Sequence, residues 1–76
     1  MNERVRHILA VVLEMPEHEI DERLSAEHTS NWDSMRHLDL VMALEEAFGV
    51  SFSSEELGGL MSYRTIVEAL GQRGVA

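Results

Sequence analysis

The clearest candidate for chemistry is a single serine at a junction between a loop and a helix. Ser34 follows Asp33 and precedes residues 35–48, a stretch without Gly or Pro that is rich in helix formers. Gly49 ends this stretch, and Asp33 and Ser34 are both suited to cap its start. The first turn of a helix carries unpaired N–H groups and the positive end of the helix dipole, which together favour a phosphate. The pattern therefore predicts an exposed hydroxyl at which a phosphate ester would be stabilised.

Alternatively, the same serine could be the nucleophile of a hydrolase. Its triad would have to come from Ser34, His37 and Asp39. His37 lies only one helical turn from the serine, Asp39 projects from another side of the helix, and no separate oxyanion hole is evident in the sequence. We therefore expect no catalytic residues and no enzyme activity.

Carboxylates and histidines precede the serine, but they lack the spacing of a metal site. Between Pro16 and Trp32 the acidic side chains are Glu17, Glu19, Asp21, Glu22 and Glu27. They do not form the Asp-x-Asp-x-Asp-Gly pattern of a calcium loop. His18 and His28 likewise have no metal-ligand spacing. We expect these groups in water, with weak and non-specific cation binding at most and no bound metal.

Composition favours one small acidic domain over residues 1–76. The chain has 14 Asp plus Glu against 6 Lys plus Arg, a formal charge of -8. That balance disfavours nucleic acid and anionic membranes as partners and favours basic protein surfaces. There is no cysteine, so any thiol chemistry must come from an added group. No apolar run reaches the roughly 20 residues of a membrane span and the first residues are too polar for a signal peptide, so we expect a cytoplasmic protein. We also expect it to be a monomer.

The first part of the chain must hold this junction from one side. Apolar residues at helical spacing predict a first helix over 3–15, capped by Asn2 and ended by Pro16. Its apolar positions are Val5, Ile8, Leu9, Val12 and Leu13. A long connection over 16–33 follows, and such a loop is usually functional or mobile. Its expected anchors on the bundle are Ile20, Leu24 and Trp32.

Two further helices are predicted after the central one. Ser53 and Glu56 match a capping box that opens a short third helix, which we expect to end near Leu60 and to be weakened by its two adjacent glycines. Ser62 is the expected cap of a last helix over 63–72. The fold class is therefore all-α: a small four-helix bundle of three longer helices plus one short third helix, with a long loop between helices 1 and 2.

The central helix carries two apolar faces when its residues are placed at steps of about 100°. The expected core residues are Leu40, Val41, Leu44, Ala47 and Phe48. The other face holds Met35, Leu38 and Met42 among Asp39, Glu45 and Glu46. This second face either packs inward, as we expect in part for Leu38, or forms a docking surface with an apolar centre and an acidic rim. Because it begins one residue after the serine, docking is favoured for Met35 and Met42.

The central segment resembles the acyl carrier protein family, and the resemblance covers nearly the whole chain. It rests on Asp33-Ser34-Met35, on the run Leu40-Val41-Met42-Ala43-Leu44-Glu45-Glu46 and on Phe48. The resemblance implies a 4'-phosphopantetheine arm that a phosphopantetheinyl transferase attaches covalently to Ser34, with Asp33 orienting the attachment region. Acyl intermediates would travel on this arm as thioesters to acyl-loading, condensing and tailoring enzymes with basic patches. The expected partner-binding residues are Met35, Arg36, Asp39, Met42, Glu45 and Glu46.

An acyl group on the arm is expected to find an apolar cleft beside the central helix. The expected lining is Leu38, Leu60, Met61 and Ile66, next to Met35 and Met42. The short third helix would yield to admit a chain, because its glycines leave it easy to displace. Only a chain of several carbons should gain from such burial.

The sequence departs from the fatty-acid pattern of this family in two places. Asn31-Trp32 stands where a small residue and its neighbour are usual, and Arg36 adds a cation two residues after the serine. These departures favour a discrete carrier of a specialised pathway, such as polyketide or modified-lipid assembly. One alternative is a housekeeping carrier of fatty-acid synthesis. Another is an acidic helical interaction module without a prosthetic group, in which Ser34 is only a helix cap.

Overall fold

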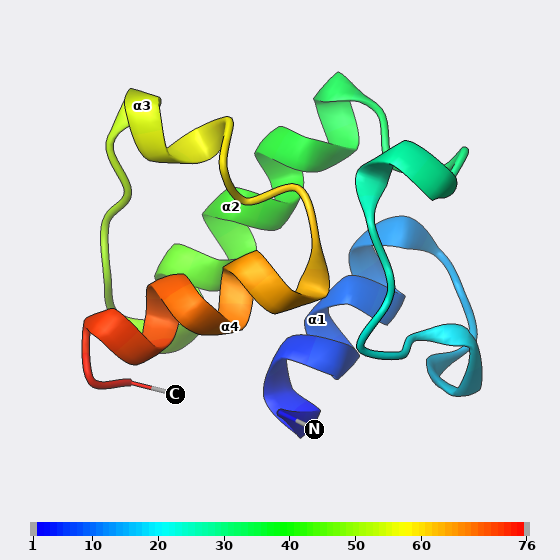
Figure 1. The fold of residues 1–76 in the computed structure, drawn as a ribbon, viewed down its shortest axis with the longest axis horizontal. Coiled ribbons are helices and arrows are strands. Elements are labelled where there is room, and N and C mark those ends of the chain that lie inside the picture. Colours follow the sequence, from blue (N-terminus) through cyan, green and yellow to red (C-terminus); the bar gives the residue numbers. More distant parts are fainter. Residues whose placement is uncertain (1, 76) are drawn as a thin grey trace.

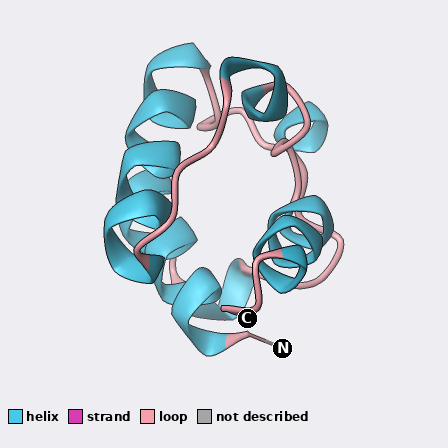
Figure 2. Ribbon diagram, turned by 90° about the vertical axis from the view of Figure 1, so that its left-hand side faces the viewer, coloured by secondary structure: helices cyan, strands magenta, loops and turns pink. Residues whose placement is uncertain are grey.

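The molecule is a bundle of short helices joined by loops (Figure 1). The computed structural model describes residues 2–75, with the elements α1 (Glu3–Leu13), η1 (Glu17–Glu19), η2 (Ala26–His28), α2 (Ser34–Phe48), α3 (Ser54–Leu57) and α4 (Tyr63–Gln72), where η marks a 3-10 turn. α1 packs against both α2 and α4. Over these residues the chain forms helices and loops without a strand (Figure 2), and none of these helices has the length and apolar character needed to cross a membrane. The all-α fold class with one short third helix is confirmed.

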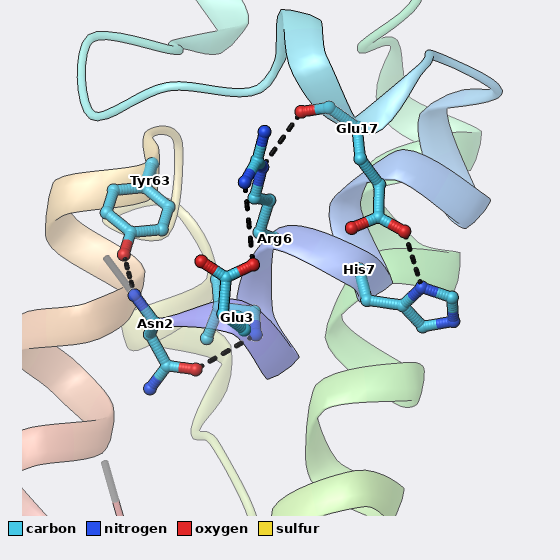
Figure 3. A network of polar contacts seen from close by, with 7 residues as sticks. Asn2, Glu3, Arg6, His7, Glu17 and Tyr63 are labelled. Carbon is cyan, nitrogen blue, oxygen red and sulfur yellow. Dashed lines mark hydrogen bonds and ion pairs between the residues drawn. The ribbon is translucent and has the colours of Figure 1, made fainter.

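The start of α1 is tied to the rest of the molecule by polar contacts (Figure 3). The carboxamide of Asn2 accepts an N–H of the first turn at 3.1 Å, which confirms the predicted cap. The N–H of Asn2 in turn donates to the hydroxyl of Tyr63 on α4. Farther along α1, Arg6 donates to the carbonyl of Glu17 at 2.8 Å, and the His7 ring lies 3.1 Å from the Glu17 carboxylate. These contacts join α1 both to α4 and to the loop that follows it.

α1 ends earlier than predicted, at Leu13 rather than at Met15. Glu14 adopts a left-handed backbone with φ 55°, and the N–H of Met15 donates to the carbonyl of Ala10 at 3.0 Å. The cause is Pro16, whose ring disfavours helical backbone in the residue before it. The helix therefore closes ahead of Met15 with a left-handed cap.

The long connection between α1 and α2 is held by buried side chains and by a backbone link. Its buried anchors are the three predicted ones, Ile20, Leu24 and Trp32. The N–H of Ala26 donates to the carbonyl of Met61 at 2.8 Å, and the N–H of Tyr63 donates to the carbonyl of Leu24 at 3.0 Å. This link fixes η2 beside the segment that leads into α4.

Side-chain caps open the last two helices. Ser53 and Glu56 exchange the two hydrogen bonds of a capping box at the start of α3, as predicted. Ser62 caps α4 as predicted, and Thr65 completes a second capping box that the sequence pattern had not indicated. Both helix starts are therefore fixed by local hydrogen bonds.

α3 is shorter than predicted, because it ends at Leu57 and not near Leu60. Gly58 and Gly59 follow it, and glycine loses more backbone entropy in a helix than any other residue. Leu60 lies outside the helix and is buried in the core with 2 % of its surface exposed.

The core is almost wholly apolar. Its largest fully buried side chains are Leu9, Leu13, Ile20, Leu40, Leu44, Ile66, Leu70 and Val5. From α2, Leu40, Val41, Leu44 and Phe48 are buried as predicted. The prediction that Ala47 is buried is wrong, because this residue is exposed. Arg4 of α1 donates to the Ala47 carbonyl, and its guanidinium stacks over the Phe48 ring at 4.3 Å. His37 is buried instead, with 7 % of its surface exposed.

Candidate functional site

Ser34 is the first residue of α2, and its side chain is exposed. Of the two residues suited to cap the helix, Asp33 does so: its carboxylate accepts the N–H of Arg36 at 2.9 Å. The Ser34 hydroxyl is therefore not used as the cap. By helix geometry the N–H groups of Ser34 and Met35 have no intrahelical acceptor. An exposed hydroxyl beside unpaired donors and the positive end of a 15-residue helix suits a phosphodiester.

An apolar cleft of about 480 Å³ begins at this serine. It is lined by Ala26, Trp32, Asp33, Ser34, His37, Leu38, Leu57, Gly58 and Met61. Leu38 and Met61, two of the residues expected to line an acyl cleft, lie in it, and both are exposed rather than packed inward, at 54 % and 41 %. Leu60 and Ile66, the other two, are core residues with 2 % and 0 % exposure and do not line it. The cleft is therefore formed by the loop, the start of α2 and the end of α3.

A chain of hydrogen bonds links three residues that line this cleft, from the loop through α2 to α3. The indole Nε1–H of Trp32 donates to Nδ1 of His37 at 3.0 Å, and Nε2 of His37 lies 2.7 Å from the carbonyl oxygen of Leu57. Because the indole nitrogen is only a donor, Nδ1 must accept, and the ring proton is on Nε2, where it is donated to Leu57. Both ring nitrogens of His37 are thus engaged away from the serine, so the hypothetical triad of Ser34, His37 and Asp39 does not form.

The helical spacing of His37 predicts burial, whereas the triad hypothesis placed its ring beside Ser34. It lies one turn before Val41 and two turns before Leu44, both of which are buried. The buried Trp32 five residues earlier supplies a donor that has to find an acceptor. Helical spacing together with this donor could have identified the pair.

Two of the six expected partner-binding residues make contacts inside the molecule. Arg36 donates to the carbonyl of Val12 at 2.8 Å and pairs with Glu14 at 3.1 Å. Glu45 accepts the N–H of Phe52 at 2.8 Å. The side chains of Arg36 and Glu45 therefore hold neighbouring segments.

The other four expected partner-binding residues are exposed on α2. They are Met35, Asp39, Met42 and Glu46, with Met35 77 % and Met42 65 % exposed. Val11 on α1 is 63 % exposed and lies with Met35 and Asp39 along a second groove on the α1 side of the serine. The sequence had not pointed to Val11, because it lies outside the apolar stripe of its own helix.

Within residues 2–75 no group of three or more His, Cys, Asp or Glu side chains is placed to hold a metal ion. His18 and His28 are exposed, as are the acidic side chains of the long connection. No buried side-chain nitrogen or oxygen of this part of the chain lacks a hydrogen-bond partner.

An all-helical bundle that presents an exposed serine at a helix start, next to an apolar cleft, has the features of a carrier for a covalently attached group. The comparison with protein families agrees: the model of the family described as "Phosphopantetheine attachment site" matches residues 3–71. The chain belongs to this family. Its members bear 4'-phosphopantetheine as a covalent group, interact with phosphopantetheinyl transferases and partner enzymes, and are generally shuttles without catalytic activity. This chain is therefore a phosphopantetheine-carrying carrier protein.

Proposed function

We propose that this protein is an acyl carrier protein whose 4'-phosphopantetheine arm is attached to Ser34. The observation that carries the proposal is the position of Ser34 as the exposed first residue of α2, with the cap supplied by its neighbour. When attached, the arm supplies the thiol that this cysteine-free chain lacks and holds the acyl group as a thioester.

Asp33 has two roles in this proposal. Its carboxylate fixes the first turn of α2 through the N–H of Arg36, and this positions the adjacent hydroxyl. Its negative charge also lies at the mouth of the cleft, where it can orient the attachment region toward a basic modifying enzyme.

Partner enzymes dock on the exposed side of α2. The apolar centre is formed by Met35 and Met42, extended toward α1 by Val11, and the acidic rim by Asp39 and Glu46. Flexible methionine side chains adapt to several partners, while the carboxylates steer basic surfaces toward the serine. Arg36 and Glu45 support this surface from within, through their contacts with α1 and with the segment before α3.

The cleft beside Ser34 shelters an apolar acyl group. Leu38 and Met61 provide its exposed apolar walls, and each buried methylene gains up to roughly 0.8 kcal/mol. Polar or very short groups gain little and stay in water. The departures at Asn31-Trp32 and Arg36 favour a specialised polyketide or modified-lipid pathway over housekeeping fatty-acid synthesis. The proposed carrier acts in the cytoplasm as a monomer.

The test is intact-mass measurement after incubation with coenzyme A and a phosphopantetheinyl transferase. The wild-type protein should gain the mass of one arm and Ser34→Ala should gain none, while the exposed loop serine in Ser30→Ala serves as the matched control and should be modified normally. Circular dichroism should show an intact helical fold for Ser34→Ala, because Asp33 still caps α2. A wild-type protein that gains no mass would leave the acidic interaction module as the better description, and modified Ser34→Ala would place the arm elsewhere.

A further inference from the structure

We propose that the hydrogen-bonded chain from Trp32 through His37 to the carbonyl of Leu57 is a floor that limits the length of the acyl group the cleft admits. This inference rests on the proposed function, since it concerns the group that the arm on Ser34 carries. It goes further by assigning selectivity for acyl length to two residues, Trp32 and His37.

The position of Trp32 and His37 at the base of the cleft follows from their burial. Both line the cleft, yet only 6 % and 7 % of their surfaces are exposed. They are the two buried residues among those that line the cleft, and the other lining residues are exposed or half-buried, which places the two rings on the core side of the cleft. Leu60 and Ile66 belong to that core and do not reach the cleft. The two rings therefore separate the cleft from the interior of the bundle.

The hydrogen bonds make this separation costly to open. A chain that passes between the rings, or between His37 and α3, must part a 3.0 Å or a 2.7 Å hydrogen bond. A hydrocarbon cannot replace either bond, so the indole N–H or a ring nitrogen of His37 would be left buried and unpaired, while the Leu57 carbonyl would keep only the N–H of Leu60 at 3.3 Å. The bond to Leu57 also ties the end of α3 to α2, and this opposes the easy displacement that the glycines after α3 would otherwise allow.

The same bonds define what the cleft accepts. Every polar atom of the two rings is engaged within the chain, so the floor offers ring surface and no free donor or acceptor. Together with the Leu38 and Met61 walls this suits a short aliphatic or aromatic acyl group lying on the rings. A longer chain would fill the cleft and continue into water.

The experiment uses the holo protein loaded with butyryl, hexanoyl, octanoyl, decanoyl and dodecanoyl groups, each checked by intact mass. A methylene that becomes fully buried should raise Tm by at most roughly 3 to 6 °C in a domain of this size, and one left in water should add nothing. We expect little gain from butyryl, and then a rise of Tm with chain length that stops before dodecanoyl. Emission of Trp32, the single tryptophan, should change in parallel and level off at the same length.

Variants of His37 distinguish a length limit set by the hydrogen-bonded rings from one set by the size of the cleft alone. His37→Ala removes both hydrogen bonds and the ring, so decanoyl and dodecanoyl should add to Tm beyond the wild-type limit, each compared with the unacylated form of the same variant. His37→Gln retains an acceptor and a donor and should keep the limit. Should His37→Ala fail to fold, the indole N–H resonance of the wild-type protein decides, because an intact floor gives it the same position with dodecanoyl as with the chain at which Tm stops rising, whereas a parted floor would shift it further.

Tm values that keep rising to dodecanoyl in the wild-type protein would overturn the floor, as would the same limit in His37→Ala. A Tm gain from none of the acyl groups would overturn both the floor and the shelter and leave the carrier assignment intact. Failure of the wild-type protein to take up the arm is seen by mass before any melting and would overturn the proposed function, and the floor with it.

Discussion

Arg36 on α2 donates a hydrogen bond from its guanidinium to the backbone carbonyl of Val12 on α1, at 2.8 Å. The same group pairs with Glu14 at 3.1 Å, and the side-chain amide of Asn31 donates to the carbonyl of Leu13 at 2.9 Å. Carbonyls at a helix C-terminus have no intrahelical donors and carry the negative end of the helix dipole. Two residues that depart from the fatty-acid pattern thus fasten the start of α2, and with it the serine, to the end of α1.

Three other arginines join separate segments in the same way. Arg4 donates to the carbonyl of Ala47, Arg6 to that of Glu17 and Arg73 to that of Ser51. A guanidinium suits this role because its planar fork of donors can satisfy a carbonyl and a carboxylate together. In a protein with few cations, most of them therefore stabilise the fold.

Replacing Arg36 with Ala should lower the free energy of unfolding by about 1–2 kcal/mol, since it removes a charged hydrogen bond and a partly exposed ion pair. Arg64→Ala changes the net charge equally, and the Arg64 side chain, exposed on α4, makes no hydrogen bond or ion pair within residues 2–75. Urea denaturation measures both variants. Equal losses would mean that charge, and not the tie to α1, sets the effect of Arg36.

Asp33→Asn should separate the cap from the charge. Asparagine caps a helix about as well as aspartate, so stability should change by only a few tenths of a kcal/mol, whereas Asp33→Ala should cost about 1 kcal/mol. We expect both variants to accept the arm more slowly than wild type, measured as initial rates by intact mass. If Asp33→Asn is modified at the wild-type rate, the carboxylate charge has no part in attachment.

Charge reversal on the exposed rim of α2 should slow association with a basic partner. The double variant Asp39→Lys/Glu46→Lys is expected to bind the transferase about tenfold more slowly at low salt, with a weaker dependence on ionic strength. Glu22→Lys/Glu68→Lys has the same net charge and alters exposed positions outside this surface. Stopped-flow rates compare the two, and similar slowing in both would reduce the effect to net charge alone. Glu45 is left unchanged because its carboxylate holds the N–H of Phe52.

Stability should depend on pH through Glu56. The hydrogen bond from Arg73, at 2.6 Å, and the backbone N–H of Ser53 lower the pKa of this carboxyl below its ordinary value of 4.5. A lowered folded-state pKa means that the unfolded chain binds more protons in this range, so the contribution is complete above 4.5 and is lost as the pH falls through the folded-state pKa. Wild-type protein should therefore melt higher than Glu56→Gln at pH 7, and the difference should shrink in acid.

The matched control is Glu55→Gln, which removes the same charge from the exposed neighbouring position. The Tm difference between wild type and Glu55→Gln should not shrink from pH 7 to acid in the way expected for Glu56→Gln. A Tm difference for Glu56→Gln that is constant with pH would contradict a role for the ionised carboxyl of Glu56.

Local sequence patterns were sufficient to predict the helices, their caps and the exposed serine. Helical periodicity and capping act over a few residues, so Asn2, Ser53 and Ser62 could be assigned to their helix starts without knowledge of the fold. The errors at Met15 and Leu60 are boundary errors, at places where a proline or a glycine pair competes with an apolar pattern.

The tertiary structure decided which side chains meet across the bundle. Trp32 and His37 form their pair only because the loop folds back on α2, and His37 reaches the Leu57 carbonyl only because α3 lies against this part of α2. Arg36 and Glu45 read as surface charges in the sequence, yet each finds a backbone partner on another segment. Burial and long-range hydrogen bonds depend on the relative placement of the packed elements, and periodicity within one helix carries no information about that placement.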